Sequence, residues 1–184
     1  MKRLSMPALI AIVVVFALVI GVVAWGVMRV TASNAGTDEH VVTTQDPLQA
    51  DPKQAATSAM TGLMTWQPAK QDSPQDAAAA IADRLTGQLE QYATSGEPDS
   101  VLPELWPAWR KAGDRVHAVT TVGEDGVHLV GGGTQAVVDV VVEQEVWHPS
   151  GDVTPYSRFT ATVEVHDIDG KWKAERYEIT DVEY

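Results

Sequence analysis

The 184-residue chain contains no cysteine. This absence excludes disulfides, a thiolate nucleophile, cysteine-ligated zinc, iron–sulfur clusters and the lipidated cysteine of a lipoprotein. Basic residues are also scarce, with 13 Lys and Arg against 25 Asp and Glu, for a net charge of −12. Because binding to phosphates needs clustered positive charge, this balance argues against nucleic acid as a partner. The length allows one domain with appendages.

One long run without charge, residues 4–28, lies between basic residues on both sides. A helix of this length spans roughly 37 Å, enough for a ~30 Å hydrocarbon core. We expect a cytoplasmic tail at 1–6, a transmembrane helix at 7–28 that binds the lipid bilayer, and a linker at 29–50. The more basic N-terminal flank predicts a cytoplasmic N-terminus and an extracytoplasmic C-terminal domain.

A cleaved signal peptide is the alternative for this segment. Residues 30–32 and 33–35 are acceptable small-residue cleavage sites, but the apolar run is longer than the 7–15 residues of a signal peptide, which favours an uncleaved anchor. Ala17 and Gly21 form a small-xxx-small pair that predicts a helix contact inside the membrane.

The extracytoplasmic domain is expected at 51–184, and helices come first. Asp51-Pro52 and Ser73-Pro74 are helix starts, each with a capping side chain before a proline. The first helix is expected to reach about Trp66 and the second about Thr94. Four residues with helical spacing define one face of the second helix: Ile81, Leu85, Leu89 and Tyr92. Prolines limit 97–110 to a short helical turn.

From residue 114 onward the pattern changes to alternating β-branched residues, which predicts strands. They are expected at 116–122 (extended or followed by 126–130), 135–147, 158–166 and 171–180, with turns at 131–133 and Asp169-Gly170. A trial pairing sets Val140 opposite Val163, Glu145 opposite Arg158 and, unfavourably, Asp139 opposite Glu164. A slip in the apolar phase of the last strand predicts a β-bulge near Glu175-Arg176.

The predicted fold class is therefore α+β: an N-terminal transmembrane helix, then helices packed on a curved antiparallel sheet of about four strands. With its closing segment Asp169-Gly170-Lys171-Trp172, this arrangement resembles the nuclear-transport-factor-2-like cone fold. It is similar to small membrane proteins of actinobacterial envelopes, either those associated with mammalian-cell-entry transport or the inner-membrane scaffolds of conjugation and type IV secretion. The resemblance implies a non-catalytic assembly role with other envelope proteins as partners, and it supplies no catalytic residue.

The sequence gives little support for a catalytic or metal-binding function. The five histidines are His40, His117, His128, His148 and His166. We expect His40 in the linker, His148 in a loop, and His117 and His166 on the outer face of the sheet. No ligand spacing typical of a metal site is present. We therefore expect no catalytic residue, no cofactor and no metal ligand.

An acidic outer face carries the candidate partner-binding residues: Trp147, Asp139, Glu143, Glu145 and Glu164. A plain solvated face is the alternative, but an exposed tryptophan beside charge is typical of an interaction hot spot. The tryptophans Trp106, Trp109 and Trp172 are expected in the core.

Three functions follow from the sequence. The first is an accessory or assembly subunit of an envelope transport or secretion complex. The second is a module that binds a small ligand or lipid in a cavity lined by residues such as Leu85, Leu89, Val140 and Phe159. The third is a tethered enzyme, which needs two titratable side chains converging in the cone, with His117 or His166 turned inward. A homo-oligomer stays open.

Overall fold

The computed structural model describes residues 46–97, 99 and 101–183. No helix within this part of the chain is long and apolar enough to cross a bilayer. The predicted tail, the membrane helix at 7–28, the Ala17–Gly21 contact and His40 lie outside the described residues. Of the predicted linker, the last residues form the 3-10 turn η1 (Pro47–Gln49). Gln49 is buried there, and its side-chain amide donates to the Asp83 carbonyl at 3.2 Å.

Helix α2 (Pro52–Met64) starts as the sequence predicts. The Asp51 side chain accepts from the Gln54 N–H at 3.0 Å and caps the first turn. The helix ends at Met64, two residues before the predicted end. Trp66 then pairs with Val116 through two backbone hydrogen bonds of 2.8 and 2.9 Å. The end of α2 is thereby attached to the edge of the sheet.

The second predicted helix is wrong in its middle. It begins at the Ser73 capping box as expected, but it divides into α3 (Pro74–Ala79), the turn η2 (Ala82–Arg84) and α4 (Gly87–Thr94). At the break, Leu85 is fully buried and bridges Ala174, and the Thr86 N–H donates to the Ala174 carbonyl at 2.8 Å. Gly87 then adopts a positive φ of 53°, which glycine tolerates. Pairing with the sheet edge outweighs the helix propensity of the alanine run.

Helix α5 (Trp106–Ala112) is the predicted short turn. Pro107 falls in its first turn, where a missing N–H costs nothing. Trp106 and Trp109 are buried against Trp66, with ring centroids 5.9 and 6.4 Å away. Trp172 is also buried, so the three tryptophans assigned to the core lie there.

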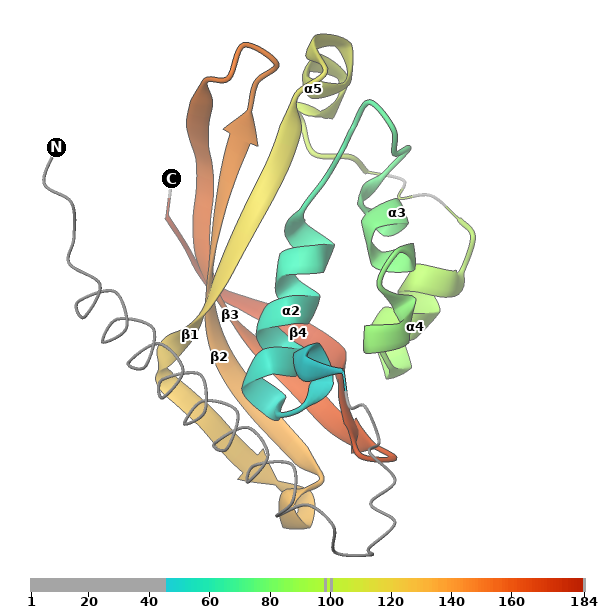
Figure 1. Cartoon of the computed structure of the whole chain (residues 1–184), viewed down its shortest axis with the longest axis vertical. Coiled ribbons are helices and arrows are strands. Elements are labelled where there is room, and N and C mark those ends of the chain that lie inside the picture. The colour runs from blue at the N-terminus through green and yellow to red at the C-terminus, as the bar shows by residue number, and fades with distance from the viewer. Residues whose placement is uncertain (1–45, 98, 100, 184) are drawn as a thin grey trace, which may run out of the picture. The chain divides into compact units, whose positions relative to one another are not determined.

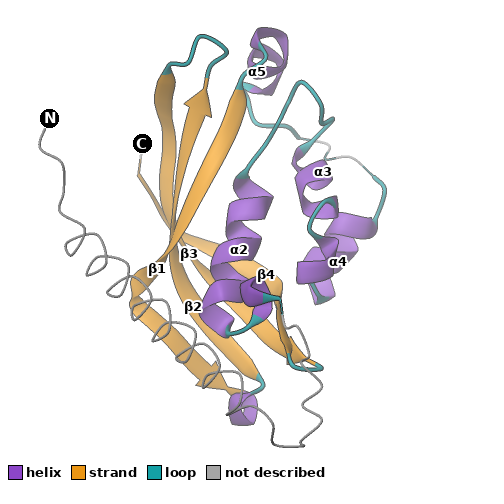
Figure 2. Cartoon of the chain, viewed as in Figure 1, coloured by secondary structure: helices purple, strands orange, loops and turns teal. Residues whose placement is uncertain are grey.

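The sheet contains β1 (Arg115–Val130), β2 (Gln135–Trp147), β3 (Val153–Ile168) and β4 (Lys171–Glu183). The strands are antiparallel in the order β1-β2-β3-β4. The sheet curves around α2, and α3 and α4 lie on the same side of it (Figure 1). Colouring by secondary structure separates the helical layer from the strand layer (Figure 2). The expected α+β class is confirmed.

The predicted strand register is wrong by two residues. Val140 lies opposite Ala161 and Arg158 lies opposite Glu143. A shift of two preserves which side chains face inward, so the apolar pattern could not distinguish the two registers. The observed register also sets Asp139 opposite Thr162, which removes the like-charge pair of the predicted one.

The predicted bulge in the last strand is confirmed. Glu164 pairs with Arg176 whereas the next residue, Val165, pairs with Ala174, so Glu175 has no residue opposite it. A second irregularity leaves Thr180 unopposed, because Thr160 pairs with Asp181 and Ala161 with Ile179. Both increase the bend of the sheet.

Candidate functional site

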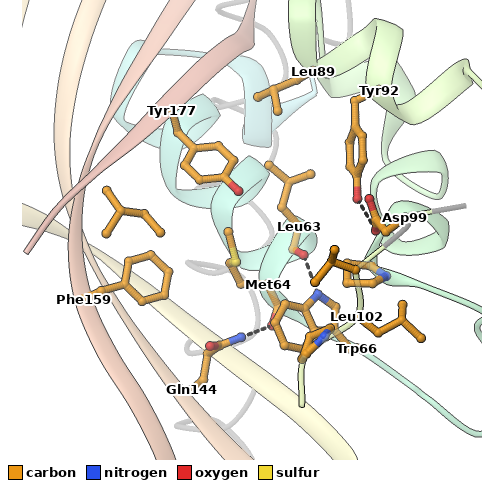
Figure 3. A pocket seen from close by; sticks show the side chains of 14 residues that line it. Leu63, Met64, Trp66, Leu89, Tyr92, Asp99, Leu102, Gln144, Phe159 and Tyr177 are labelled. Carbon is orange, nitrogen blue, oxygen red and sulfur yellow. Dashed lines mark hydrogen bonds between the residues drawn. The ribbon is translucent and has the colours of Figure 1, made fainter. Parts of the chain in front are cut away.

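A cavity of about 650 Å³ opens between the helices and the sheet. Ten of the side chains that line it are labelled in Figure 3. Helices α2, α3 and α4, residues 99 and 101–103, and strands β2, β3 and β4 contribute to its wall. The apolar wall residues are Leu63, Met64, Trp66, Pro74, Leu89, Val101, Leu102, Pro103, Phe159 and Ile179. The volume falls in the range of small-molecule sites.

A tyrosine–aspartate pair lies at one side of the cavity. The Tyr92 hydroxyl donates to Asp99 Oδ2 at 2.7 Å, and the Gln75 backbone N–H donates to the same oxygen at 3.2 Å. Burial, and then the hydrogen bond to Asp99, raise the pKa of Tyr92 well above its ordinary value of 10.0. Tyr92 is therefore a neutral hydrogen-bond donor at neutral pH.

Tyr177 faces the same cavity from β4 (Figure 3). Burial raises its pKa above 10.0, and the negative charge of Asp99 raises it further. No hydrogen bond of its hydroxyl is found within the described part of the chain. The phenol thus stays neutral and can donate to a molecule in the cavity.

The other polar wall groups are already occupied. Gln144 is buried on the inner face of β2, where its amide donates to the Met64 carbonyl at 2.8 Å and accepts from the Ser157 hydroxyl at 2.7 Å. The Trp66 indole N–H donates to the Leu63 carbonyl at 2.8 Å. These bonds hold the end of α2 against the sheet and shape the cavity floor.

The sequence predicted only some of the residues that line this cavity. Leu89 and Phe159 line the cavity as expected, whereas Leu85 and Val140 are fully buried in the core. The helical spacing predicts Tyr92 on the same helix face as Leu89, but nothing in the sequence indicates that Asp99, in an irregular segment, meets it. His117 and His166 do not line this cavity, and two other titratable groups, Tyr92 and Asp99, converge there instead.

On the opposite face of the sheet, Trp147 is 46 % exposed. Its ring stacks on His117 with centroids 4.8 Å apart, and its indole N–H donates to Glu145 Oε2 at 3.3 Å. The other tryptophans of the described residues are at most 9 % exposed. We refer to His117, Glu143, Glu145 and Trp147 as the Trp147 patch.

The predicted partner-binding residues do not form one cluster. Asp139 is six residues from Glu145 along β2, or about 20 Å, and lies 3.9 Å from His128 Nε2. Glu164 lies on the same outer face, opposite Val137 in the neighbouring strand, and forms an ion pair with Arg176 at 2.5 Å. Glu143 belongs to the Trp147 patch and pairs with Arg158.

Three potential metal ligands gather around the bulge of β4. Potential ligand atoms of Glu164, His166 and Glu175 lie within 4.8 Å of one another, and His166 Nε2 is 2.5 Å from Glu175 Oε2. The sequence predicts no metal here. The Arg176 guanidinium donates to Glu164 and holds the pKa of that carboxyl below 4.5. This adjacent positive charge disfavours a second cation.

His148 connects an acid to a hydroxyl. Its Nδ1 lies 2.9 Å from Asp114 Oδ1 and its Nε2 lies 3.0 Å from Thr154 Oγ1. The order acid–histidine–hydroxyl is that of a hydrolytic triad. None of the three residues lines the cavity, and Asp114 is 6 % exposed. The network attaches the β2–β3 loop to the start of β1, in keeping with the satisfied loop histidine expected from the sequence.

No protein-family model and no curated protein matches the chain. Among solved structures it is similar to CagV, a VirB8 homolog of the T4SS from Helicobacter pylori strain 26695, with 11 % identity and a TM-score of 0.48 over 71 % of this chain and 97 % of that one. It is also similar to the intermembrane space region of the chloroplast protein ARC6, with 16 % identity and a TM-score of 0.35 over 69 % and 95 % of the two chains. Neither similarity says what this chain binds.

Proposed function

We propose that the chain is a non-catalytic, single-pass membrane protein that serves as an accessory or assembly subunit of an envelope transport or secretion complex. The observation that supports this function best is the Trp147 patch. Trp147 is the one tryptophan of the described residues left in solvent, and its indole N–H donates to the carboxylate of Glu145. Burying an indole at an interface contributes large contact area at small entropic cost, which is why tryptophan dominates hot spots.

Charge indicates the kind of partner. Residues 44–184 contain 10 basic and 23 acidic residues, a net charge of −13. Such a domain repels anionic lipid headgroups and attracts a basic protein surface. The predicted anchor keeps the domain at the membrane, which raises its effective concentration for membrane-bound partners.

The predicted topology can be tested first. We expect the full chain to stay in membrane vesicles after an alkaline carbonate wash. Protease added to intact spheroplasts should digest residues 51–184. Release by carbonate, or full protection of the domain, would exclude the proposed topology.

The role of the patch is tested by purifying the tagged full chain from solubilised membranes of its native cells. We expect a stable complex with the wild type and with Leu129→Ala, a control that removes an exposed apolar side chain from the β1 end. Trp147→Ala should lose the complex. Co-purifying subunits identify a transport or a secretion system. Recovery of the wild-type chain alone, or of an unchanged complex with Trp147→Ala, would contradict the proposal.

Ligand binding is the second candidate, and the cavity is the observation that favours it. A domain that serves only as a scaffold needs no open space in its core, yet about 650 Å³ remain open between α2, α4 and the sheet. Two functions can coexist in one domain, because the cavity and the Trp147 patch lie on opposite faces of the sheet.

A further inference from the structure

The cavity contains a carboxylate without a counter-ion. Asp99 forms no ion pair with any of the residues that the structure describes, and both of its hydrogen bonds, from Tyr92 and Gln75, reach the same oxygen, Oδ2. Its other oxygen, Oδ1, is left without a hydrogen bond in that part of the chain. A carboxylate at an apolar wall is costly unless a cation or donors compensate it.

A second polar group faces the same space. The Tyr177 hydroxyl points into the cavity (Figure 3) and, within the described residues, it has no partner either. The presence of Asp99 raises the pKa of Tyr92 and of Tyr177. The negative charge of Asp99 therefore acts on both phenols of the cavity wall.

The remaining wall is suited to an apolar body. Leu63, Met64, Leu89 and Phe159 line the cavity together with Asp99. Ile179 and Leu102, 46 % and 36 % exposed, are further apolar side chains of its wall that solvent reaches. Sites of this kind bind a ligand by apolar contact and orient it through a few placed polar groups. Here those groups are an unpaired carboxylate oxygen and a phenol.

We propose that the cavity binds a small amphiphilic amine, whose cationic head pairs with Asp99 and the Tyr177 hydroxyl and whose apolar body lies against the α2–α4 wall. The inference rests on the ligand-binding function above and specifies its ligand class. Hydrogen bonds to charged groups contribute enough to favour the amine over a neutral analogue by roughly ten- to a hundredfold.

The test uses three probes with one apolar body and different heads: octylamine, 1-octanol and octanoate. The full chain is placed in lipid nanodiscs, and calorimetric titrations are corrected with empty nanodiscs. We expect octylamine to bind at least tenfold more tightly than octanol, and octanoate to bind most weakly. Equal binding of the amine and the alcohol would overturn the amine assignment while leaving a ligand cavity in place.

Two pairs of variants locate the binding. Asp99→Asn keeps an oxygen for Tyr92 and Gln75 but removes the charge, so the preference for the amine should disappear. Asp125→Asn, an exposed carboxylate on β1, should preserve it. Ile179→Trp narrows the cavity and should weaken octylamine and octanol alike, whereas Ile168→Trp, similarly exposed at the end of β3, should change neither.

Circular dichroism of each variant confirms that the fold is retained. An unchanged amine preference in folded Asp99→Asn overturns the inference. Binding that is unaffected by Ile179→Trp places the probes outside the cavity and also overturns it. If no probe binds the wild type, both the amine assignment and the ligand-binding function fail, whereas the assembly function depends on Trp147 and is judged separately.

Discussion

Along β2, the residues at even positions from 136 to 146 are buried beneath the helices, whereas those at odd positions face away from them. The inner face is alanine and valine, with one glutamine. The outer face ends in Glu143, Glu145 and Trp147. Of two neighbouring residues on this strand, one therefore lies in the packed core and the other faces water. We expect inner-face side chains to determine stability and outer-face side chains to contribute little to it, and four changes test how strictly that division holds.

The largest effect should come from removing a buried tryptophan, in contrast to removing the exposed one. Trp106→Ala removes a side chain that is 1 % exposed and packed against Trp66, and it should lower the free energy of unfolding by about 3–5 kcal/mol. Trp147→Ala should change it by less than about 0.5 kcal/mol. Urea denaturation followed by circular dichroism measures both. A large loss with Trp147→Ala would show that the outer face is structural.

Gln144 is the polar exception on the inner face. Gln144→Leu places an apolar residue where its neighbours are valines, yet it leaves the Met64 carbonyl and the Ser157 hydroxyl without their partner. We expect a loss of about 1–3 kcal/mol in the same denaturation experiment. Glu143→Gln, one residue away on the outer face, should cost less than about 0.5 kcal/mol. A stabilised Gln144→Leu protein would mean that burial alone governs this face.

Tyr177 should make the stability of the fold depend on pH in the alkaline range. Because its pKa is raised in the folded state, the unfolded chain ionises first near pH 10.0 and binds fewer protons above it. The stability contribution of the protonated phenol is complete below pH 10 and is lost as pH rises through the folded-state pKa. Tyr177→Phe should reduce the alkaline decline of the melting temperature. An identical decline in both proteins between pH 9 and 11 would contradict this.

The smallest effect concerns the ion pair of the outer face. Arg176 lowers the pKa of Glu164 mainly through its hydrogen bond, so Arg176→Gln should raise that pKa toward 4.5. Because the pKa of Glu164 is lowered in the folded state, its ionised carboxyl stabilises the fold above pH 4.5. This contribution to stability is lost as the pH falls through the folded-state pKa. Carbonyl NMR titration of Glu164 measures the shift, and Arg158→Gln, whose arginine pairs with Glu143 and Glu183, serves as the control. An unchanged Glu164 titration would sink the prediction.

Local sequence patterns predicted those elements that are defined by a buried face and by the residues at their ends. The Asp51 and Ser73 caps, the alternation of β2, the Asp169-Gly170 turn and the bulge at Glu175 all depend on residues within a few positions of one another. Trp147 was identified as an exposed anchor for the same reason, since its position in the alternation places it on the outer face.

What the sequence could not decide depended on partners distant along the chain. The helix over 73–94 breaks because Leu85 and Thr86 join the edge of β4 at Ala174, about ninety residues later. The register of β2 on β3 was ambiguous because a two-residue shift preserves both faces. The meeting of Tyr92, Asp99 and Tyr177 around one cavity likewise depends on how α4 docks on the sheet. Periodicity and capping depend on interactions between residues close in sequence, so the sequence alone determines them. Edge pairing, register and cavity shape depend on which distant surfaces pack together in the folded domain.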